Sequence, residues 1–461
     1  MTVAFAARAL LPDGWARNVR MTIDADGNFA SVQPDARAKD ADWRCDAAIP
    51  GIPNLHSHAF QRGMAGLAER RMNATDSFWT WRTLMYRLAL KVTPEQMEAI
   101  AAKLYVEMLR AGFTQVAEFH YLHHDPDGTP YADMAEMAQR LANASEQAGI
   151  GLTILPTLYA QSGFGAAPLN DMQRRFRTTP DMIGRIAESM RARGASSPLL
   201  RVGLGLHSLR AATIEAMHAA CAIVSGAPVH IHVAEQQAEV DACLAATGSR
   251  PMALLLAALP VDRSWCLIHA THVTDEEIRG VARAGAVVGL CPITEANLGD
   301  GLFPLAGLIA QGGRFGIGTD SNILVSAAEE LRLLEYGQRL DRQERCIALA
   351  SGGTGPSGGI GSVGRALFDS VVGGGAAACG LETHGLVTGA RADLVSLDVE
   401  ALALPDLEED AILDSALFAC SRLPVRDVLC AGRFSIRGGR HVADEAINAR
   451  FRAAMRALLS D

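Results

Sequence analysis

The chain has 461 residues, of which 49% are hydrophobic and 20% charged, and its formal net charge is −9. This composition is typical of a soluble globular protein, and the length suits one large domain with a smaller one. The negative charge argues against a nucleic-acid partner, because binding phosphates requires a basic surface.

The cysteines and the N-terminus indicate a location for the protein. The nine cysteines are odd in number and form no CxxC pair, which favours reduced thiols in the cytoplasm. The segment MTVAFAARALLPDGW has no basic region followed by a long apolar run, and no later stretch reaches the ~20 apolar residues of a membrane span. We therefore expect a soluble, cytoplasmic protein with no membrane contact.

Two kinds of local pattern follow each other along the first part of the chain. Residues 1–50 are typical of short strands separated by the hairpin-type turns Asp13-Gly14 and Asp26-Gly27. From Ala47 onward, apolar strands alternate with helices. We expect strands over 47–55, 113–119, 151–158, 201–206, 228–232, 264–268, 285–291 and 314–319.

The helices between these strands have recognisable ends. Thr93 and Thr274 are each an N-cap followed three residues later by Gln or Glu, and Gly112 and Gly285 lie beyond the two helices. Eight strand–helix units over roughly 330 residues favour a (β/α)₈ barrel with some long loops. A doubly wound open sheet is the competing α/β architecture.

The positions of the ionisable residues favour the barrel, whose chemistry collects where strands end. The residues found at expected strand ends are His56, His58, His120, Tyr121, His207, His232, His269 and Asp320. We therefore predict a TIM-type (β/α)₈ barrel over residues 51–385.

Short strands return near the C-terminal end, over 392–399 and 425–443. We predict one composite, β-sandwich-like domain made of residues 1–50 and 386–461, which ends in an amphipathic helix over 444–460. The Gly-rich stretch 351–364 contains GxGxxG but follows no strand. It therefore predicts a flexible loop, with Ser362 capping a helix, rather than a nucleotide site.

The stretch PGIPNLHSHAF (50–60) is the first candidate for chemistry. On an extended strand, His56 and His58 point the same way, and two neutral imidazoles on one face are half of a divalent-metal site. A pair of surface or capping histidines is the alternative for this motif taken alone.

The segment VHIHVAE adds a third histidine and a carboxylate. His232 closes the fifth strand, and Glu235 follows in the turn, where it can carry a proton beside a metal site without being a ligand. His230 lies deeper on the same strand face, where a hydrogen-bonded core histidine is the favoured interpretation over a role behind the metal.

The last two elements are IHATH and GIGTDSN. His269 ends the sixth strand, and we prefer it for the site over His272, which is read as a cap or surface residue. Asp320 ends an apolar strand, where a buried carboxylate is costly unless it is paired or metal-bound. A helix N-cap is the alternative for Asp320, but the two histidine motifs favour a metal ligand.

Together LHSH, HVAE, IHATH and GTDSN resemble the amidohydrolase superfamily, specifically its mononuclear deaminase branch. The resemblance implies one divalent metal ion, usually zinc, held by His56, His58, His232 and Asp320. It also implies that Glu235 shuttles a proton and that His269 orients the attacking water. Binuclear members that use a carbamylated lysine on strand four are not matched, because the chain's lysines, Lys39, Lys91 and Lys103, all precede that strand.

Further motifs are similar to the N-formimino-L-glutamate deiminase family of histidine degradation. They are LHSHAFQRGMAG (55–66), SFWTWRTLMYRL (77–88), the His120-Tyr121 pair, HSLR (207–210) and CPITEANLGDG (291–301). This resemblance implies that the substrate is held by Gln61, Arg82, Tyr121, His207 and Arg210. Arginine suits the two carboxylates of such a substrate, although a solvated salt bridge is the ordinary role of one arginine.

The predicted function is therefore metal-dependent hydrolysis of N-formimino-L-glutamate to N-formyl-L-glutamate and ammonia. Trp79 and Trp81 leave open a stacking lid for a nucleobase, although we interpret them as packing for the loop that carries Arg82. A nucleobase deaminase for guanine or cytosine is therefore one alternative, and a catalytically inactive barrel used for assembly is another. We also expect a homodimer, which is the commonest oligomer.

Overall fold

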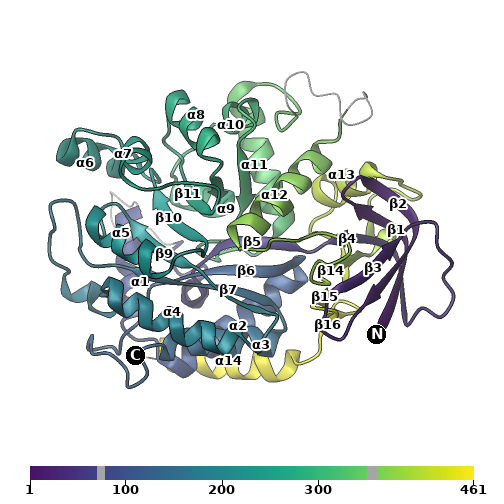
Figure 1. The fold of residues 1–461 in the computed structure, drawn as a ribbon, viewed down its shortest axis with the longest axis horizontal. Coiled ribbons are helices and arrows are strands. Elements are labelled where there is room, and N and C mark those ends of the chain that lie inside the picture. Colours follow the sequence, from purple (N-terminus) through teal and green to yellow (C-terminus); the bar gives the residue numbers. More distant parts are fainter. Residues whose placement is uncertain (70–77, 350–360, 461) are drawn as a thin grey trace.

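The computed structural model describes residues 1–69, 78–349 and 361–460, and it places two sheets beside each other (Figure 1). One sheet is a parallel barrel from the middle of the chain, and the other is a mostly antiparallel sheet from both chain ends, called here the end sheet. The predicted barrel with a small β unit from both ends is confirmed, and the open doubly wound sheet is excluded.

Nine described strands form the parallel sheet of the barrel. Eight of them pair in sequence around the barrel, and the ninth, β8, pairs only with β7. The path closes where Ser57 at the end of the first strand bridges to Asp320 after the last strand. The strands are β5 (Ile52–Ser57), β6 (Phe113–His120), β7 (Gly151–Leu158), β8 (Leu200–Val202), β9 (Leu204–Ser208), β10 (Val229–Val233), β11 (Trp265–His269), β12 (Val287–Leu290) and β13 (Arg314–Ile317).

The predicted single strand over 47–55 is wrong, because two strands that serve different sheets share this apolar run. Residues Trp43–Pro50 form β4 in the end sheet, and the first barrel strand starts at Ile52. Gly51 separates them, and a Cβ at this position would lie 2.1 Å from Thr114 Oγ1. Only glycine therefore allows the chain to pass from one sheet to the other so close to β6.

The end sheet has the strand order β17-β16-β15-β14-β4-β1-β2-β3. Its other strands are β1 (Thr2–Leu11), β2 (Gly14–Ile23), β3 (Phe29–Gln33), β14 (Leu394–Leu397), β15 (Val425–Cys430), β16 (Arg433–Arg437) and β17 (Arg440–His441). The C-terminal helix α14 (Asp444–Leu459) lies against α2 (Pro94–Arg110) of the barrel, where Arg110 and Asp444 form an ion pair of 2.7 Å. The domain boundaries 1–50, 51–385 and 386–461 stay a prediction.

The helices surround the barrel and begin where the sequence indicated. Thr93 and Thr274 both form capping boxes, and Ser362 caps α12. The remaining helices are α1 (Phe78–Ala89), α3 (Glu136–Ala148), α4 (Pro180–Gly194), α5 (Ile214–Ile223), α6 (Gln237–Thr247), α7 (Pro251–Ala258), α8 (Asp275–Ala284), α9 (Pro292–Leu298), α10 (Leu305–Ala310), α11 (Ala327–Arg342), α12 (Val363–Ala378) and α13 (Asp410–Phe418), with 3₁₀ turns η1 (Ala59–Met64), η2 (Asp171–Phe176) and η3 (Val399–Ala401). The stretch 350–360, which includes most of the Gly-rich segment, lies outside the described residues.

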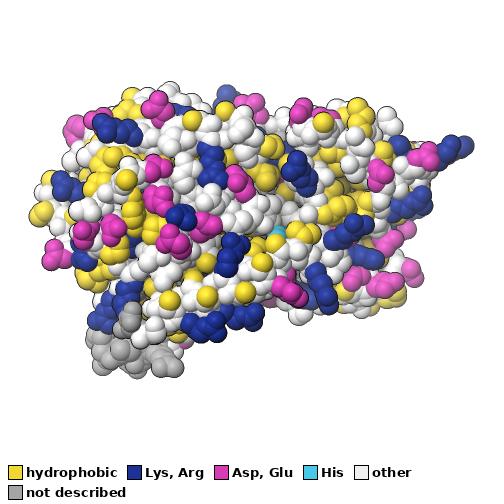
Figure 2. Space-filling view, turned by 90° about the horizontal axis from the view of Figure 1, so that it is seen from below, with side chains coloured by type: hydrophobic (Ala, Val, Ile, Leu, Met, Phe, Trp, Pro, Cys, Tyr) yellow, Lys and Arg dark blue, Asp and Glu magenta, His cyan; other side chains and the backbone are white. Residues whose placement is uncertain are grey.

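The surface carries both signs of charge. Figure 2 shows basic and acidic side chains on the same face, with apolar side chains between them. All nine cysteines are free thiols, as the sequence predicted. Among the described helices, none combines the length and the apolar character needed to cross a bilayer.

Candidate active site

Four side chains predicted as metal ligands converge at the carboxyl ends of the barrel strands. His56 lies in β5 and His58 directly follows it, His232 lies in β10, and Asp320 follows β13. Asp320 Oδ1 lies 3.3 Å from Nε2 of His56 and 3.3 Å from Nε2 of His58, and the Nε2 atoms of His56 and His232 are 3.1 Å apart. All four residues are buried.

The separations and the ring orientations fit a bound divalent cation. Ligand atoms held 2.0–2.2 Å from one tetrahedral ion lie about 3.3 Å from one another. His58 Nδ1 is 2.9 Å from the Phe119 carbonyl, and His232 Nδ1 is 2.9 Å from the His207 carbonyl. Since a carbonyl only accepts, each Nδ1 carries the proton, and each Nε2 lone pair faces the site.

The protonation states also suit a metal site. Burial lowers the pKa of His56 to about 3, and burial likewise lowers the pKa of His58 and of His232, so these imidazoles are neutral near pH 7. Burial by itself raises the pKa of Asp320, but the hydrogen bond from His56 and the neighbouring histidines hold that pKa below its ordinary value. Three neutral nitrogens and one carboxylate oxygen are a zinc-type donor set.

A buried polar network holds this site at the seam of the barrel. The Asn322 amide nitrogen donates to the carbonyl oxygens of Asp320 and His58, at 2.8 and 3.1 Å. Its Oδ1 accepts a 2.6 Å hydrogen bond from Thr319, whose hydroxyl accepts in turn from Asn54. The Asn322 side-chain amide therefore fixes the backbone of two candidate metal ligands, His58 and Asp320.

Glu235 and His269, the predicted proton carrier and water-orienting residue, lie together beside the metal-binding group. His269 Nε2 is 3.7 Å from Glu235 Oε1 and 3.8 Å from Asp320 Oδ2. Burial raises the pKa of Glu235 to about 7, which suits a proton donor near neutral pH. Burial by itself lowers the pKa of His269, but the surrounding carboxylates raise it to about 10.

Glu295 is a partner of His269 that the sequence reasoning missed. Its Oε1 lies 3.1 Å from His269 Nδ1 and accepts a 2.8 Å hydrogen bond from the Cys291 backbone N–H. This contact fixes the ring of His269 with its Nε2 toward Glu235. Glu295 lies in α9, five residues after the end of β12, and the available signal was only that it falls in the quoted CPITEANLGDG motif.

A cavity of about 630 Å³ opens beside the metal-binding group, and all five predicted substrate-binding residues line it. Gln61 donates a 3.0 Å hydrogen bond to the Tyr121 hydroxyl, and the Arg82 guanidinium lies 5.4 Å from the centre of the Tyr86 ring. The lining comprises His58, Gln61, Trp81, Arg82, Met85, Tyr86, Tyr121, Tyr159, Phe176, His207, Ser208, Arg210, His232, Glu235, Glu239, His269, Leu298 and Asp320.

Several polar atoms of this cavity wall are shielded from solvent and have no protein partner among the described residues. They are Gln61 Oε1, Arg210 Nη1 and Glu239 Oε1. A buried polar atom of this kind needs a ligand or a water molecule to satisfy it. The cavity therefore offers a cationic donor and two acceptors to one small polar molecule.

The other histidines and aromatic residues considered in the sequence differ in whether they line the cavity, and His120 and His230 do not. His120 packs against His123 with ring centres 4.6 Å apart, and His230 lies 2.8 Å from the Ala378 carbonyl, so the interpretation of His230 as a core histidine is confirmed. Trp81 lines the cavity, whereas the side chain of Trp79 lies outside the described residues. Tyr159, which directly follows β7, was missed, although Tyr121 occupies the matching place after β6.

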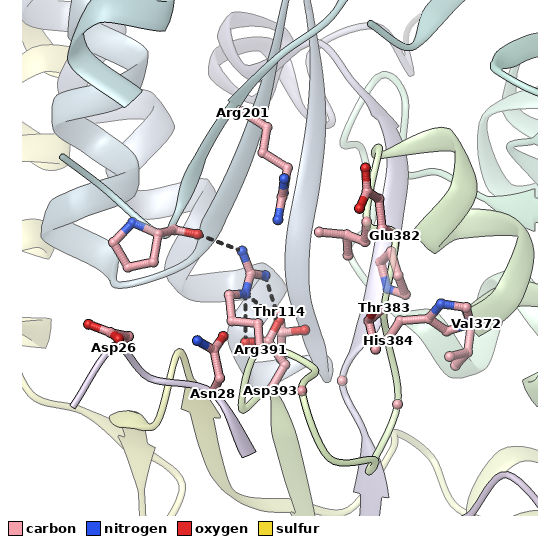
Figure 3. A pocket seen from close by; sticks show the side chains of 16 residues that line it. Asp26, Asn28, Thr114, Arg201, Val372, Glu382, Thr383, His384, Arg391 and Asp393 are labelled. Atoms are coloured by element: carbon pink, nitrogen blue, oxygen red, sulfur yellow. Dashed lines mark hydrogen bonds and ion pairs between the residues drawn. The ribbon is translucent and has the colours of Figure 1, made fainter. Parts of the chain in front are cut away.

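A larger cavity of about 1070 Å³ lies between the barrel and the end sheet (Figure 3). Its central arginine, Arg391, is already paired with Asp393 at 2.5 Å and with Gln115 at 2.8 Å. None of the four candidate metal ligands lines it. The smaller cavity is therefore the candidate active site.

Comparison with known proteins agrees with this geometry. Residues 47–434 match the model of the amidohydrolase family, and residues 1–46 match that of the formimidoylglutamate deiminase HutF, N-terminal domain. The chain is 50% identical to the formimidoylglutamate deiminase of Pseudomonas aeruginosa over 96% of this chain and 97% of that protein. It is 24% identical to a 5-methylthioadenosine/S-adenosylhomocysteine deaminase of Haloarcula marismortui, over 93% and 91% of the two chains.

A solved structure extends the comparison to three dimensions. The crystal structure of an amidohydrolase from Brucella melitensis is 50% identical and superposes with a TM-score of 0.95, covering 100% of both chains. The family resemblance expected from the four strand-end motifs is confirmed over nearly the whole length. The chain belongs to the amidohydrolase family.

Proposed function

We propose that this enzyme hydrolyses the C=N bond of N-formimino-L-glutamate, giving N-formyl-L-glutamate and ammonia, as a step of histidine degradation. The observation that carries the proposal is that Arg82 and Arg210 line the same cavity as the metal-binding group and Glu235. Two arginines match the two carboxylates of this substrate, because a guanidinium binds a carboxylate through two parallel hydrogen bonds. The 50% identity to a formimidoylglutamate deiminase supports the same substrate.

We propose zinc as the ion, held by His56, His58, His232 and Asp320, because its preferred ligands are of this kind. When bound, such an ion lowers the pKa of water toward ~7 and makes hydroxide available at neutral pH. A homodimer and a cytoplasmic location complete the proposal, the latter supported by the free thiols of all nine cysteines.

The protein's own residues divide the proton transfers. Asp320 accepts the proton of the attacking water, and Glu235 gives a proton to the imino nitrogen, which makes the amidine carbon electrophilic. His269 hydrogen-bonds to the attacking oxygen as the carbon becomes tetrahedral, and Glu295 holds its ring in place. Asp320 then gives the proton it took from water to the nitrogen, and the hydroxyl of the tetrahedral carbon gives its proton to Glu235. Ammonia leaves as the C=O bond forms, and both carboxyl groups return to their starting states.

Remaining cavity residues hold the substrate. The arginines take the carboxylates, while Gln61, Tyr121 and His207 offer neutral hydrogen-bonding groups in the same cavity. Burial keeps the pKa of His207 well below its ordinary value, so His207 is neutral. A neutral imidazole can accept a hydrogen bond from an amidine N–H.

The test is ammonia release from N-formimino-L-glutamate, with guanine and cytosine as competing substrates and with metal content measured on the same protein. We expect turnover of the amidine only. Glu235→Gln and His269→Asn should retain metal and fold but lose about 10²–10⁴-fold in kcat. Turnover of a planar base instead would support the nucleobase deaminase, and the absence of both metal and ammonia release would support an inactive barrel.

A further inference from the structure

Glu239 is a carboxylate of the cavity wall that the mechanism above does not use. It lies in the first turn of α6, four residues after Glu235. Its Oε2 accepts a 3.0 Å hydrogen bond from the backbone N–H of Glu235, and its Oε1 is shielded from solvent without a protein partner in the described chain. No ion pair within 4.0 Å is recorded for Glu239 among the described residues.

The contact with Glu235 lies in a strained turn. Ala234, between β10 and Glu235, has φ of 52°, which is a left-handed conformation that costs about 1 kcal/mol for a residue other than glycine. Helix α6 has no N-cap side chain, since Gln236 makes no capping hydrogen bond. The Glu239 carboxylate does not replace this cap. It accepts instead from the turn that precedes the helix, from the backbone N–H of Glu235 and with a contribution from that of Ala234.

Two carboxyl groups close together in a poorly hydrated cavity compete for protons, because the second negative charge is disfavoured by the first. Burial raises the pKa of both Glu235 and Glu239, and the charge of Glu239 adds to the rise at Glu235. The positive charges of His269 and Arg210 oppose this rise. The charged or titratable groups that interact with Glu235 from its own and neighbouring elements include Arg82, Arg210, Glu239, His269, Asp300 and Asp320.

We propose that Glu239 is a positioning residue that fixes the backbone of Glu235 and, through its negative charge, keeps a proton on the Glu235 carboxyl until the substrate takes it. The inference rests on the proposed function for the role of Glu235 as the proton donor. A purely structural role for Glu239, in which it only holds the turn before α6, would account for the backbone hydrogen bonds but not for any electrostatic effect on Glu235.

Three variants separate the backbone role from the charge. Glu239→Gln keeps an oxygen that accepts the Glu235 N–H but removes the charge, whereas Glu239→Ala removes both. Asp241→Asn is the matched control, because Asp241 is an exposed carboxylate on the same helix that contacts only Gln237 among the hydrogen bonds of the described residues. Thermal unfolding of each variant shows whether the fold is retained.

The first readout is the pH profile of kcat/KM for ammonia release. If Glu235 must be protonated, Glu239→Gln moves the alkaline limb to lower pH by about one unit, and kcat/KM above that limb falls about tenfold. Glu239→Ala loses a further factor of about ten in kcat, because Glu235 is no longer held in place. Asp241→Asn leaves the limb where it is.

The second readout needs no substrate. Infrared difference spectra between each protein and its Glu235→Gln counterpart, recorded over a range of pH, give the midpoint at which the Glu235 carboxyl loses its proton. We expect this midpoint to fall in Glu239→Gln by the same amount as the alkaline limb. A midpoint that is unmoved in Glu239→Gln, or that moves equally in Asp241→Asn, overturns the inference.

The two readouts also separate the inference from the proposed function. If the wild-type enzyme releases no ammonia from N-formimino-L-glutamate, the proposed function fails, while the infrared midpoint still decides what Glu239 does. The wild type could be active while Glu239→Gln shows a reduced kcat, an unmoved alkaline limb of the pH profile and an unmoved infrared midpoint. In that case Glu239 has a structural role only, and the inference fails while the proposed function stands.

Discussion

Replacing Asn322 by alanine is expected to weaken both the fold and the metal site. The side chain is fully buried, and its amide nitrogen lies within hydrogen-bonding distance of three oxygens, those of Ser57, His58 and Asp320. Its own oxygen accepts from Thr319. The amide nitrogen has two hydrogens and so donates two hydrogen bonds at a time, and the amide oxygen accepts one. The substitution to alanine therefore removes three hydrogen bonds, worth about 0.5–1.5 kcal/mol each.

The backbone adds a second contribution. Asn322 has φ of 57°, a left-handed conformation that asparagine tolerates and alanine does not, which costs about 1 kcal/mol more. We therefore expect Asn322→Ala to lower the free energy of unfolding by about 3–5 kcal/mol. Asn322→Gly loses the same hydrogen bonds without the backbone strain, so it should be the less destabilised variant by about 1 kcal/mol.

The assay has two parts. Denaturant unfolding of metal-free protein gives the stability difference, and competition with a chelator gives the affinity for zinc, which we expect to fall about 10–100-fold because His58 and Asp320 lose their common support. A loss below about 1 kcal/mol, or a zinc affinity within twofold of wild type, would refute the reasoning. Equal stability of the glycine and alanine variants would refute the strain component alone.

Three further changes test other parts of the structure. Burial raises the pKa of Glu118 to about 8, so the folded protein keeps a proton that the unfolded chain releases near pH 4.5. The free energy of unfolding should therefore fall by about 5 kcal/mol as pH rises from about 4.5 to 8, and Glu118→Gln should flatten this slope in pH-dependent unfolding. Arg175 is fully buried and donates to the backbone carbonyls of His124, Val92 and Ala89. Arg175→Met should therefore cost about 3–5 kcal/mol in denaturant unfolding, and a cost below 1 kcal/mol would contradict this account. Arg210→Lys should raise KM for N-formimino-L-glutamate at least about tenfold, because lysine cannot bind a carboxylate through two parallel bonds, and saturation curves for ammonia release with an unchanged KM would exclude that role.

The barrel and the metal-binding group could be predicted because both depend on local order along the chain. An apolar strand that ends in His or Asp is unusual, and parallel strands bring all such ends to one rim. His56 and His232 are far apart in sequence, but each is the last residue but one of its strand, and Asp320 lies three residues beyond the end of β13. Their convergence to 3.1–3.3 Å follows from the closure of the barrel.

Residues on helical turns could not be placed in the same way. Glu239 and Glu295 each lie on a helix that begins beyond a strand end, where a glutamate ordinarily stabilises the helix N-terminus or faces solvent. Their sequence surroundings do not say that one carboxylate reaches back to Glu235 and the other to His269. These two contacts depend on the geometry of the tight turns between strand and helix, which the local sequence does not specify.

The strand break at Gly51 and the left-handed residues at the barrel strand ends were unpredictable for the same reason, since both depend on contacts with distant parts of the chain. Left-handed backbone at Ala234, His269, Asp320 and Asn322 gathers at the ends of three barrel strands, although none of these residues is glycine. Such conformations persist only where the surroundings over-determine them. Here the surroundings are the Asn322 amide, the Glu295 carboxylate and the Glu239 carboxylate, each of which holds a strained segment next to a side chain proposed as catalytic or metal-binding. The side chains of the candidate site therefore depend on a second group of buried polar residues. Substitutions of Asn322 or Glu295, which do not line the cavity and are not among the four candidate metal ligands, should still reduce turnover.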